Sequence, residues 1–368
     1  MTIEGKFGEA KVFATSIDSG AREQIKTLLD QDFIKGAKVR IMSDVHVGVG
    51  CVIGFTADLK DRVVPNIVGV DIGCGVLTVE LGQLKVDLAK LDQLIYSRIP
   101  AGKNMHKQKV VHFEPLYELR MFKELQNLER LENSIGTLGG GNHFIELGED
   151  SRGNSYLTIH SGSRNLGTQV ARYYQNSAVK MCRTEGLTYP RNLCFLQGKH
   201  REAYLHDMAI CQEYAQLNRE TMATIILNNL VKRDLSDFPS FHSIHNYINF
   251  KDNIIRKGAI SAYEGERLLI PINMRDGSIL GFGRGNRDWN YSAPHGAGRV
   301  LSRTEAKAQL TLEAFKKSME GIYSTSVHKG TLDESPAAYK QIDEILASIG
   351  ETVAIEEIIK PCYNFKSS

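Results

Sequence analysis

The sequence predicts a mixed α/β fold in which short strands, turns and helices build one large body. Alternating apolar residues over 76–81 are typical of a half-buried strand. Apolar residues at helical spacing recur in other segments, beginning with Ile25, Leu28, Leu29 and Phe33. Because the two patterns interleave irregularly, they favour mixed sheets over a clean parallel doubly wound sheet. The chain has 368 residues, 42% of them hydrophobic, which is enough for a large core.

The first half of the chain is predicted to begin with a helix and to continue mainly with strands and helices. We expect helices over 21–34, 84–98 and 114–132, and strands over 38–42 and 76–81. A glycine-rich loop over 136–141 follows. It leads into a strand over 144–147 and a β-rich segment that ends at His160.

The second half opens with two long helical stretches, about 166–183 and 200–232. We expect residues 166–232 to form a helical insertion that stands apart from the α/β core, within a single domain over 1–368. Residues 243–282 return to short strands and turns, and 302–320 and 336–347 are predicted to be helical.

Charge balance, cysteine content and apolar runs indicate the cellular environment of the protein and the partners it can bind. Lys and Arg number 45 against 43 Asp and Glu, so a basic coat for nucleic acid is excluded and any polyanion site must be local. The six cysteines include no Cys-x-x-Cys pair, and neither a signal peptide nor a membrane-length apolar run is visible. We therefore expect a soluble cytoplasmic protein with free or metal-bound thiols and no membrane partner.

The most informative segment is 292–303, Ser-Ala-Pro-His-Gly-Ala-Gly-Arg-Val-Leu-Ser-Arg. It places His295 beside two glycines and two arginines, Arg299 and Arg303. Glycine allows close approach of the backbone to a ligand, and arginine matches phosphate oxygens in a bidentate manner. His295 could therefore attack phosphorus, act as an acid or base, or bind a metal.

Several further segments offer metal ligands on glycine-rich or polar stretches. Each has a structural alternative, namely an ordinary turn, a buried cysteine or a structural histidine. Taken together they could supply two metals, and ligand chemistry alone leaves zinc and manganese open. The segments are Asp44-Val-His46, Asp71-Ile-Gly-Cys74-Gly75, Gly139-Gly-Gly-Asn142-His143-Phe-Ile-Glu146, His160-Ser-Gly-Ser-Arg164 and His245-Asn246.

The ordered set of motifs resembles the RtcB family of RNA-splicing ligases. It runs over nearly the whole chain, from Asp44-Val-His-Val-Gly and Val70-Asp-Ile-Gly-Cys-Gly through Gly136-Thr-Leu-Gly-Gly-Gly-Asn-His-Phe-Ile-Glu and His160-Ser-Gly-Ser-Arg to His295-Gly-Ala-Gly-Arg and Asp333-Glu-Ser-Pro-Ala-Ala-Tyr-Lys. The resemblance implies an RtcB-like fold, with mixed sheets around a central metal and nucleotide cleft. It also implies a reaction that joins RNA 3′-phosphate or 2′,3′-cyclic phosphate ends to 5′-hydroxyl ends with GTP and two Mn(II) ions.

The resemblance implies a role for each matching residue. His295 would become guanylylated, and Asp44 would lie near the 5′-hydroxyl chemistry. One metal would be held by Asp71, Cys74 and His143, and the second by Cys74, His160 and His245. Nucleotide contacts would come from Asn142, His143, Phe144, Ile145, Glu146, His245, Asn246, Ser278, His295, Gly296, Ala297, Gly298, Tyr339 and Lys366, and RNA phosphate contacts from Arg130, Arg164, Arg299 and Arg303.

The implied partners are RNA with broken ends, such as tRNA halves or cleaved RNA, together with GTP and an activating protein; a monomer is expected. One segment departs from the family. Many members carry Gly-Ser-Met-Gly after Leu-Ile-Pro, where this chain has Ile272-Asn-Met-Arg-Asp-Gly277. Two other functions fit part of the pattern: a two-metal phosphoesterase or nuclease acting on RNA ends, and a non-catalytic RNA-binding relative.

Overall fold

The fold is that of a mixed α/β protein, as predicted, and the computed structural model describes residues 1–367. Most strands belong to two sheets. The first sheet has the order β1 (Thr2–Glu4), β2 (Glu9–Val12), β3 (Val39–His46), β4 (Ile53–Ala57), β12 (Ile255–Lys257) and β11 (Asn246–Ile248). The second has the order β10 (Ser240–Ile244), β6 (Gly75–Gly82), β8 (Ser155–Ser161), β7 (Phe144–Glu149), β17 (Val353–Lys366), β15 (Gly277–Gly283) and β14 (Arg267–Asn273).

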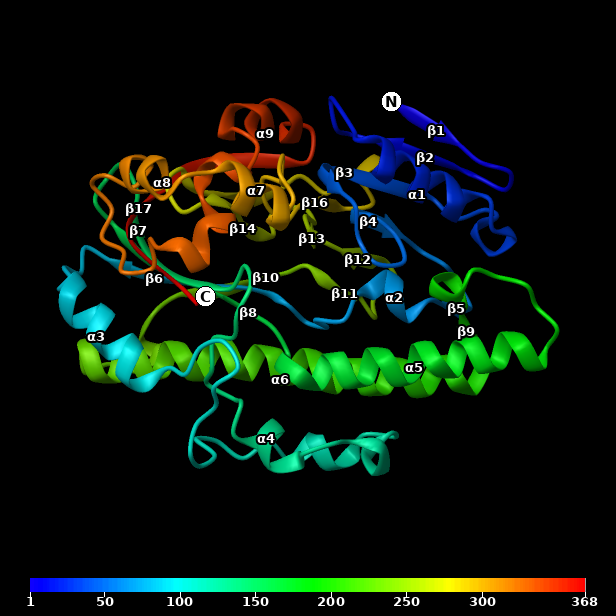
Figure 1. Cartoon of the computed structure of the whole chain (residues 1–368), viewed down its shortest axis with the longest axis horizontal. Helices are drawn as coiled ribbons and strands as arrows, with labels where there is room; N and C mark the ends of the chain where they lie inside the picture. The colour runs from blue at the N-terminus through cyan, green and yellow to red at the C-terminus, as the bar shows by residue number, and fades with distance from the viewer. Residues whose placement is uncertain (368) are drawn as a thin grey trace.

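Two small strand pairs and the helices complete the architecture (Figure 1). The pairs are β13 (Ala259–Ser261) with β16 (Ser292–Pro294) and β5 (Arg62–Val63) with β9 (Leu196–Gln197). The α-helices are α1 (Ser19–Leu29), α2 (Pro65–Val68), α3 (Leu88–Arg98), α4 (Leu128–Glu132), α5 (Arg164–Thr184), α6 (Gly198–Leu230), α7 (Arg303–Gln309), α8 (Leu312–Ser318) and α9 (Ile342–Ile349). No helix within residues 1–367 combines the length and apolar character needed to span a lipid bilayer.

The long helices α5 and α6 were predicted correctly as helices, but they do not stand apart from the core. Val170 and Tyr174 of α5 belong to the same apolar cluster as residues of the first sheet, such as Phe55. Met222 and Ile226 of α6 pack in the cluster that covers one face of the second sheet. Figure 1 shows both helices running side by side beneath the strands. Whether 166–232 is an insertion, and whether 1–368 is a single domain, stay predictions.

The predicted helix over 114–132 is wrong. The chain forms two 3₁₀ turns, Glu114–Glu118 and Phe122–Glu124, before the short helix α4. Tertiary contacts explain the break. The Asp207 carboxylate accepts hydrogen bonds from the backbone N–H groups of Arg120 and Met121 at 2.8 and 3.1 Å. Backbone donors that a continuous helix would pair with its own carbonyls are therefore satisfied from α6.

Other elements differ in their ends or were not anticipated. The segment 302–320 contains two helices, because Ser302 caps α7 and Thr311 caps α8. The segment 336–347 begins with a 3₁₀ turn, and α9 starts at Ile342. The N-terminal hairpin β1–β2 and the 14-residue strand β17 were not predicted. β17 is central to the second sheet, where it pairs with both β7 and β15.

Candidate active site

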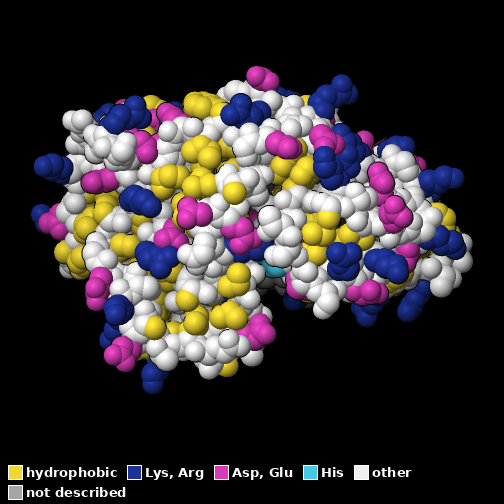
Figure 2. Space-filling model, turned by 90° about the horizontal axis from the view of Figure 1, so that it is seen from above, with side chains coloured by type: hydrophobic (Ala, Val, Ile, Leu, Met, Phe, Trp, Pro, Cys, Tyr) yellow, Lys and Arg dark blue, Asp and Glu magenta, His cyan; other side chains and the backbone are white. Residues whose placement is uncertain are grey.

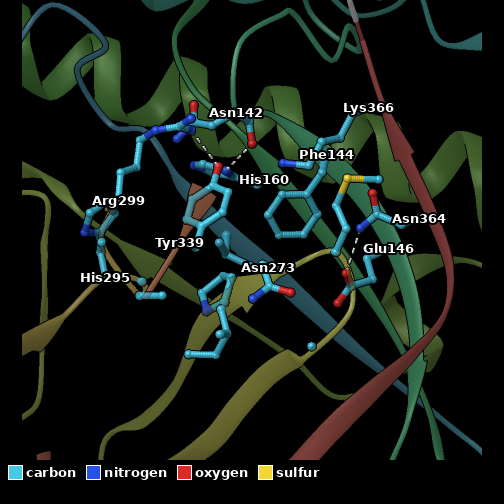
Figure 3. A pocket seen from close by; sticks show the side chains of 18 of the residues that line it. Asn142, Phe144, Glu146, His160, Asn273, His295, Arg299, Tyr339, Asn364 and Lys366 are labelled. Carbon is cyan, nitrogen blue, oxygen red and sulfur yellow. Dashed lines mark hydrogen bonds between the residues drawn. The ribbon is translucent and has the colours of Figure 1, made fainter. Parts of the chain in front are cut away.

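A cavity of about 300 Å³ lies where the second sheet meets the loop after β16. Its wall includes Phe144 and Glu146 of β7, Lys366 of β17, and the segments 271–274 and 295–299. The surface is hollowed near the middle of the molecule, and a histidine side chain is visible in the hollow among acidic and basic groups (Figure 2). Figure 3 shows the lining side chains, which converge from strands distant in sequence.

Asp44 orients His295 within this cavity. The buried Asp44 carboxylate accepts hydrogen bonds from the His295 backbone N–H at 3.1 Å and from its ring Nδ1 at 2.6 Å. Because Nδ1 then carries the proton, the lone pair of a neutral ring lies on Nε2. Gly298 has a φ of +77°, and a Cβ there would lie 2.8 Å from the Asp44 carbonyl oxygen. Only glycine therefore allows this loop to lie against β3.

The predicted metal ligands lie in a continuous line. Asp71 Oδ2 lies 3.1 Å from His143 Nε2, which lies 3.5 Å from Cys74 Sγ. Cys74 Sγ lies 3.3 Å from His160 Nε2, which is 3.3 Å from His245 Nε2. The ligand atoms of Cys74, His143 and His160 all fall within 4.8 Å of one another. The thiol is thus central, between an Asp–His pair on one side and a His–His pair on the other.

The chemistry of these side chains suits a divalent cation. The carbonyl oxygens of Leu138 and Asn142 lie 2.9 Å from His143 Nδ1 and 3.2 Å from His160 Nδ1, which leaves both Nε2 lone pairs facing the thiol. Burial lowers the pKa values of His160 and His245 well below the usual range, so both rings are neutral, as metal ligation requires. Burial and Asp71 raise the pKa of the Cys74 thiol, and a bound cation would displace its proton.

An acidic pair, Asp333 and Glu334, holds the basic side chains at one side of the cavity. Arg303 donates to both carboxylates at 2.6 and 2.7 Å. Lys366 donates to Glu334 at 2.6 Å, and Arg299 donates to Glu334 at 3.4 Å. Burial alone would raise the pKa of Glu334, but Lys366 and Arg303 lower it to about 2. The motif that begins at Asp333 therefore fixes the positions of the arginine and lysine side chains around the cavity.

Tyr339 completes this network. Its hydroxyl donates to Glu334 at 2.8 Å and accepts from Arg299 at 3.0 Å, and the Arg299 guanidinium lies over its ring at 4.8 Å. The ring therefore has a fixed position in the cavity wall, where it is drawn near the centre of Figure 3.

Four residues predicted to bind nucleotide do not line the cavity. His143 lies behind the wall, in the line with Asp71 and Cys74. Ile145 points to the opposite face of its strand, into the apolar core. Asn246 instead holds the loops, donating to the Asp71 carbonyl oxygen at 3.3 Å and accepting from Gly258 N–H at 3.1 Å. Ser278 is buried within β15, and its neighbour Gly277 lines the cavity in its place.

Arg130 and Arg164 lie away from the cavity wall. Their guanidinium groups donate to the carbonyl oxygens of Lys103 at 2.7 Å and Gly102 at 3.1 Å, and so hold the same turn. Contact of any of the four arginines with RNA phosphates stays a prediction.

Several lining residues were not predicted as site residues, among them His46 and Asn364. Asn273 and Met274 also line the cavity, and they belong to the segment 272–277 that departs from the family. His46 was noted only as an upstream imidazole, and its Nδ1 lies 2.9 Å from the Asp44 carbonyl oxygen. Asn364 had a usable signal, because it lies two residues before Lys366 and a strand repeats its face every second residue. The spacing has this meaning only within a strand, and β17 was not predicted.

Comparison with known proteins shows the family of the chain. The family described as "tRNA-splicing ligase RtcB" matches residues 24–124 and 119–367. The chain belongs to the RtcB family. It is 31% identical to the RNA-splicing ligase RtcB of Escherichia coli K12 over 379 residues, with 92% of each chain covered. It is 27% identical to the tRNA-splicing ligase RtcB of Archaeoglobus fulgidus, with 94% of this chain and 90% of the relative covered.

In this RtcB-family chain, the structure joins residues from motifs far apart in sequence. His295 packs against His245, with ring centroids 4.7 Å apart, so the oriented histidine and the line of ligands meet in one place. Such a place could hold a phosphate between a nucleophile and metal-bound charge.

Proposed function

We propose that this chain is an RNA ligase that joins RNA 3′-phosphate or 2′,3′-cyclic phosphate ends to 5′-hydroxyl ends, using GTP and Mn(II). The observation that carries the proposal is the 2.6 Å contact between Asp44 Oδ2 and His295 Nδ1. It directs an Nε2 lone pair toward a cavity that is also bordered by His160 and His245, the last two members of the Asp–His–Cys–His–His line. RNA with broken ends, such as tRNA halves, is the expected substrate.

His295 is the nucleophile in the first step. Its Nε2 attacks the α-phosphorus of GTP, an N–P bond forms, and the bond to the β-phosphate oxygen breaks so that pyrophosphate leaves. Asp44 is a positioning residue here, since its carboxylate holds the Nδ1 proton and stabilises the positive charge that develops on the ring. This role of Asp44 is more specific than the one that the family resemblance implied, which placed Asp44 only near the 5′-hydroxyl chemistry.

The second and third steps transfer GMP and seal the strand. Water first opens a cyclic phosphate to a 3′-phosphate, whose oxygen then attacks the histidine-bound phosphorus and releases the imidazole. The 5′-hydroxyl oxygen attacks the activated 3′-phosphorus, and GMP leaves. Arg299 and Arg303 are the arginines in the cavity wall and are the candidates for gripping RNA phosphates.

The five predicted ligands are well suited to two metal ions with Cys74 shared between them. Asp71, Cys74 and His143 would hold one ion, and Cys74, His160 and His245 the other. When bound, the two Mn(II) ions would supply positive charge for the phosphate oxygens.

Labelling with GTP tests the proposal directly. Incubation with α-labelled GTP and Mn(II), followed by denaturing electrophoresis, should give a labelled protein band that acid removes, because an N–P bond is acid-labile. His295→Ala should abolish the band, and Asp44→Asn should slow labelling about 100-fold or more, because the ring loses its oriented tautomer. His112→Ala, which alters a half-exposed histidine outside the cavity, is the matched control.

An RNA stem with one broken strand, carrying 2′,3′-cyclic phosphate and 5′-hydroxyl ends, tests the remaining steps. Sealing of the strand supports the proposal. Absence of label with GTP and with every other nucleotide contradicts it, and hydrolysis of the RNA end without label would identify a two-metal phosphoesterase instead.

A further inference from the structure

Four side chains form a panel on the cavity face of two neighbouring strands. β7 and β17 are antiparallel, and their register pairs Glu146 with Asn364 and Phe144 with Lys366. Since side chains alternate along a strand, these four share one face. All four line the cavity, whereas the intervening Phe365 points into the apolar core. The panel is therefore built by strand geometry rather than by a loop (Figure 3).

Asn364 is the member of this panel whose hydrogen bonding is incomplete. Its Nδ2 donates to Glu146 Oε2 at 2.7 Å. Its Oδ1 has no hydrogen-bond partner among the described residues, although the side chain is only 1% exposed. A buried acceptor without a partner costs free energy, so an unpaired amide oxygen in a cavity wall suggests a donor supplied by a ligand.

Asn273, the nearby amide in the same wall, differs in this respect. Its Oδ1 accepts from the backbone N–H groups of Arg275 and Asp276, and its Nδ2 donates to the Asp276 carboxylate. The loop that replaces the usual family segment therefore satisfies its own amide. Asn364 Oδ1, in contrast, is a buried acceptor without a partner among the described residues.

The paired residues define the chemistry of that molecule. Glu146 Oε2 accepts from the Asn364 amide nitrogen, which leaves Glu146 Oε1 and Asn364 Oδ1 as acceptors. The two residues are directly opposite each other in the strand register. A planar ligand edge with adjacent N–H donors would match them. Guanine has such an edge in its N1–H and 2-amino groups, whereas adenine presents an N1 acceptor there and hypoxanthine lacks the 2-amino group.

We propose that Asn364 is a specificity-determining residue for guanine, with Oδ1 accepting a hydrogen bond from the 2-amino group while Nδ2 holds Glu146 in place as a second acceptor. This inference rests on the proposed function, because it assigns the base of the nucleotide that His295 would attack. Nothing in the chemistry of the line of metal ligands would distinguish one base from another. The base is selected on the sheet, on the panel of Phe144, Glu146, Asn364 and Lys366.

A comparison of GTP with ITP isolates the proposed hydrogen bond, because the two nucleotides differ only in the 2-amino group. Asn364→Leu keeps the size of the side chain and removes both polar atoms. We expect the wild-type protein to be labelled about tenfold faster by GTP than by ITP. Asn364→Leu also removes the Nδ2 bond to Glu146, whose second oxygen would accept from the N1–H of either base, so both rates should fall. The GTP rate should fall about tenfold further than the ITP rate, so that the preference disappears.

Equal losses for GTP and ITP, or an unchanged preference, would overturn the inference, because Asn364 would then act only through general structure. Asn364→Ala serves as the second variant if the leucine protein does not fold. If the wild-type protein is not labelled by any nucleotide, the proposed function fails, and equilibrium binding of GTP and ITP in Mn(II) gives the same comparison. Loss of the GTP preference in that assay still supports the assignment of Asn364, and its retention contradicts it.

Discussion

At the residue scale, burial and partners decide what each ionisable side chain can do. Glu146 and Glu334 are both buried carboxyls near Lys366, yet their pKa values move in opposite directions. Burial raises the pKa of Glu146 to about 7, and the Asn364 hydrogen bond and the charge of Lys366 only partly offset it. Glu334 receives direct hydrogen bonds from Lys366 and Arg303, which overcome burial. Distance to a cation, rather than residue type, determines the outcome.

Glu146 should make stability depend on pH in a way that is unusual for a carboxyl group. An unfolded glutamate loses its proton near 4.5, whereas folded Glu146 keeps it to about pH 7. Between these values the folded state binds the extra proton, so stability falls as pH rises through this window and then levels off. In metal-free protein, Glu146→Gln should therefore raise the free energy of unfolding at about pH 8 by up to roughly 3 kcal/mol.

The gain from Glu146→Gln should shrink toward about pH 5, which urea denaturation at both pH values can measure. Glu334→Gln is the matched comparison. Its carboxyl has a lowered pKa and contributes stability at neutral pH, so the substitution should destabilise there. An effect of Glu146→Gln that is the same at both pH values would contradict the raised pKa.

At the element scale, helix α6 holds together the segments that carry the predicted metal ligands. Asn218 accepts from the backbone N–H groups of Gly136 and Thr137 and donates to the Gly162 carbonyl oxygen. The adjacent Arg219 donates to the carbonyl oxygens of Gly73 and Ser161, both at 2.8 Å. Gly73 precedes Cys74 and Ser161 follows His160, so one buried guanidinium fixes the spacing between two predicted ligands.

Replacing Arg219 should weaken metal binding more than it weakens folding. We expect Arg219→Met to lower Mn(II) affinity about tenfold or more, as loss of groups that orient metal ligands commonly does. Isothermal titration with Mn(II) measures this directly, without any activity assay. Arg256→Met is the matched control, because Arg256 is equally buried and also binds backbone carbonyls, but at Asn290 and Tyr291. Equal losses of affinity in both variants would contradict the role of α6.

At the scale of the whole molecule, the line of ligands joins distant parts of the chain. Cys74 immediately precedes β6, His143 precedes β7, His160 lies in β8, and His245 lies between β10 and β11. In the unfolded chain these residues are far apart, so a cation that uses these ligands would bind the folded state selectively. Metal binding should therefore add to global stability.

Mn(II) should raise the melting temperature relative to protein in excess chelator. At about 100 times the dissociation constant the gain is about 2.7 kcal/mol, which corresponds to roughly 3–5 °C for a chain of this size. Differential scanning calorimetry measures the shift. Cys74→Ser should remove most of it while leaving the melting temperature in chelator nearly unchanged. A shift of full size in that variant would show that the metal binds elsewhere.

Local patterns were sufficient to predict much of the fold and many of the side chains that the structure brings together. The periodicity of residues 166–183 and 200–232 predicted two long helices, because each helix repeats its buried face every three to four residues. The glycine-flanked motifs marked Asp71, Cys74, His143, His160, His245 and His295, because ligands and nucleophiles need particular side chains and flexible backbone nearby. The mixed α/β class followed from the same patterns.

Contacts between distant segments decided the rest. The helix expected over 114–132 is broken because Asp207 of another helix binds its backbone, and no local pattern reveals that competition. Asp44 became a positioning residue only when β3 met the loop of His295, 251 residues later. Asn364 entered the cavity because β17 pairs with β7. Sequence determined which chemical groups were present; the tertiary structure decided which of them meet, since hydrogen bonds and pKa shifts act over only a few ångströms.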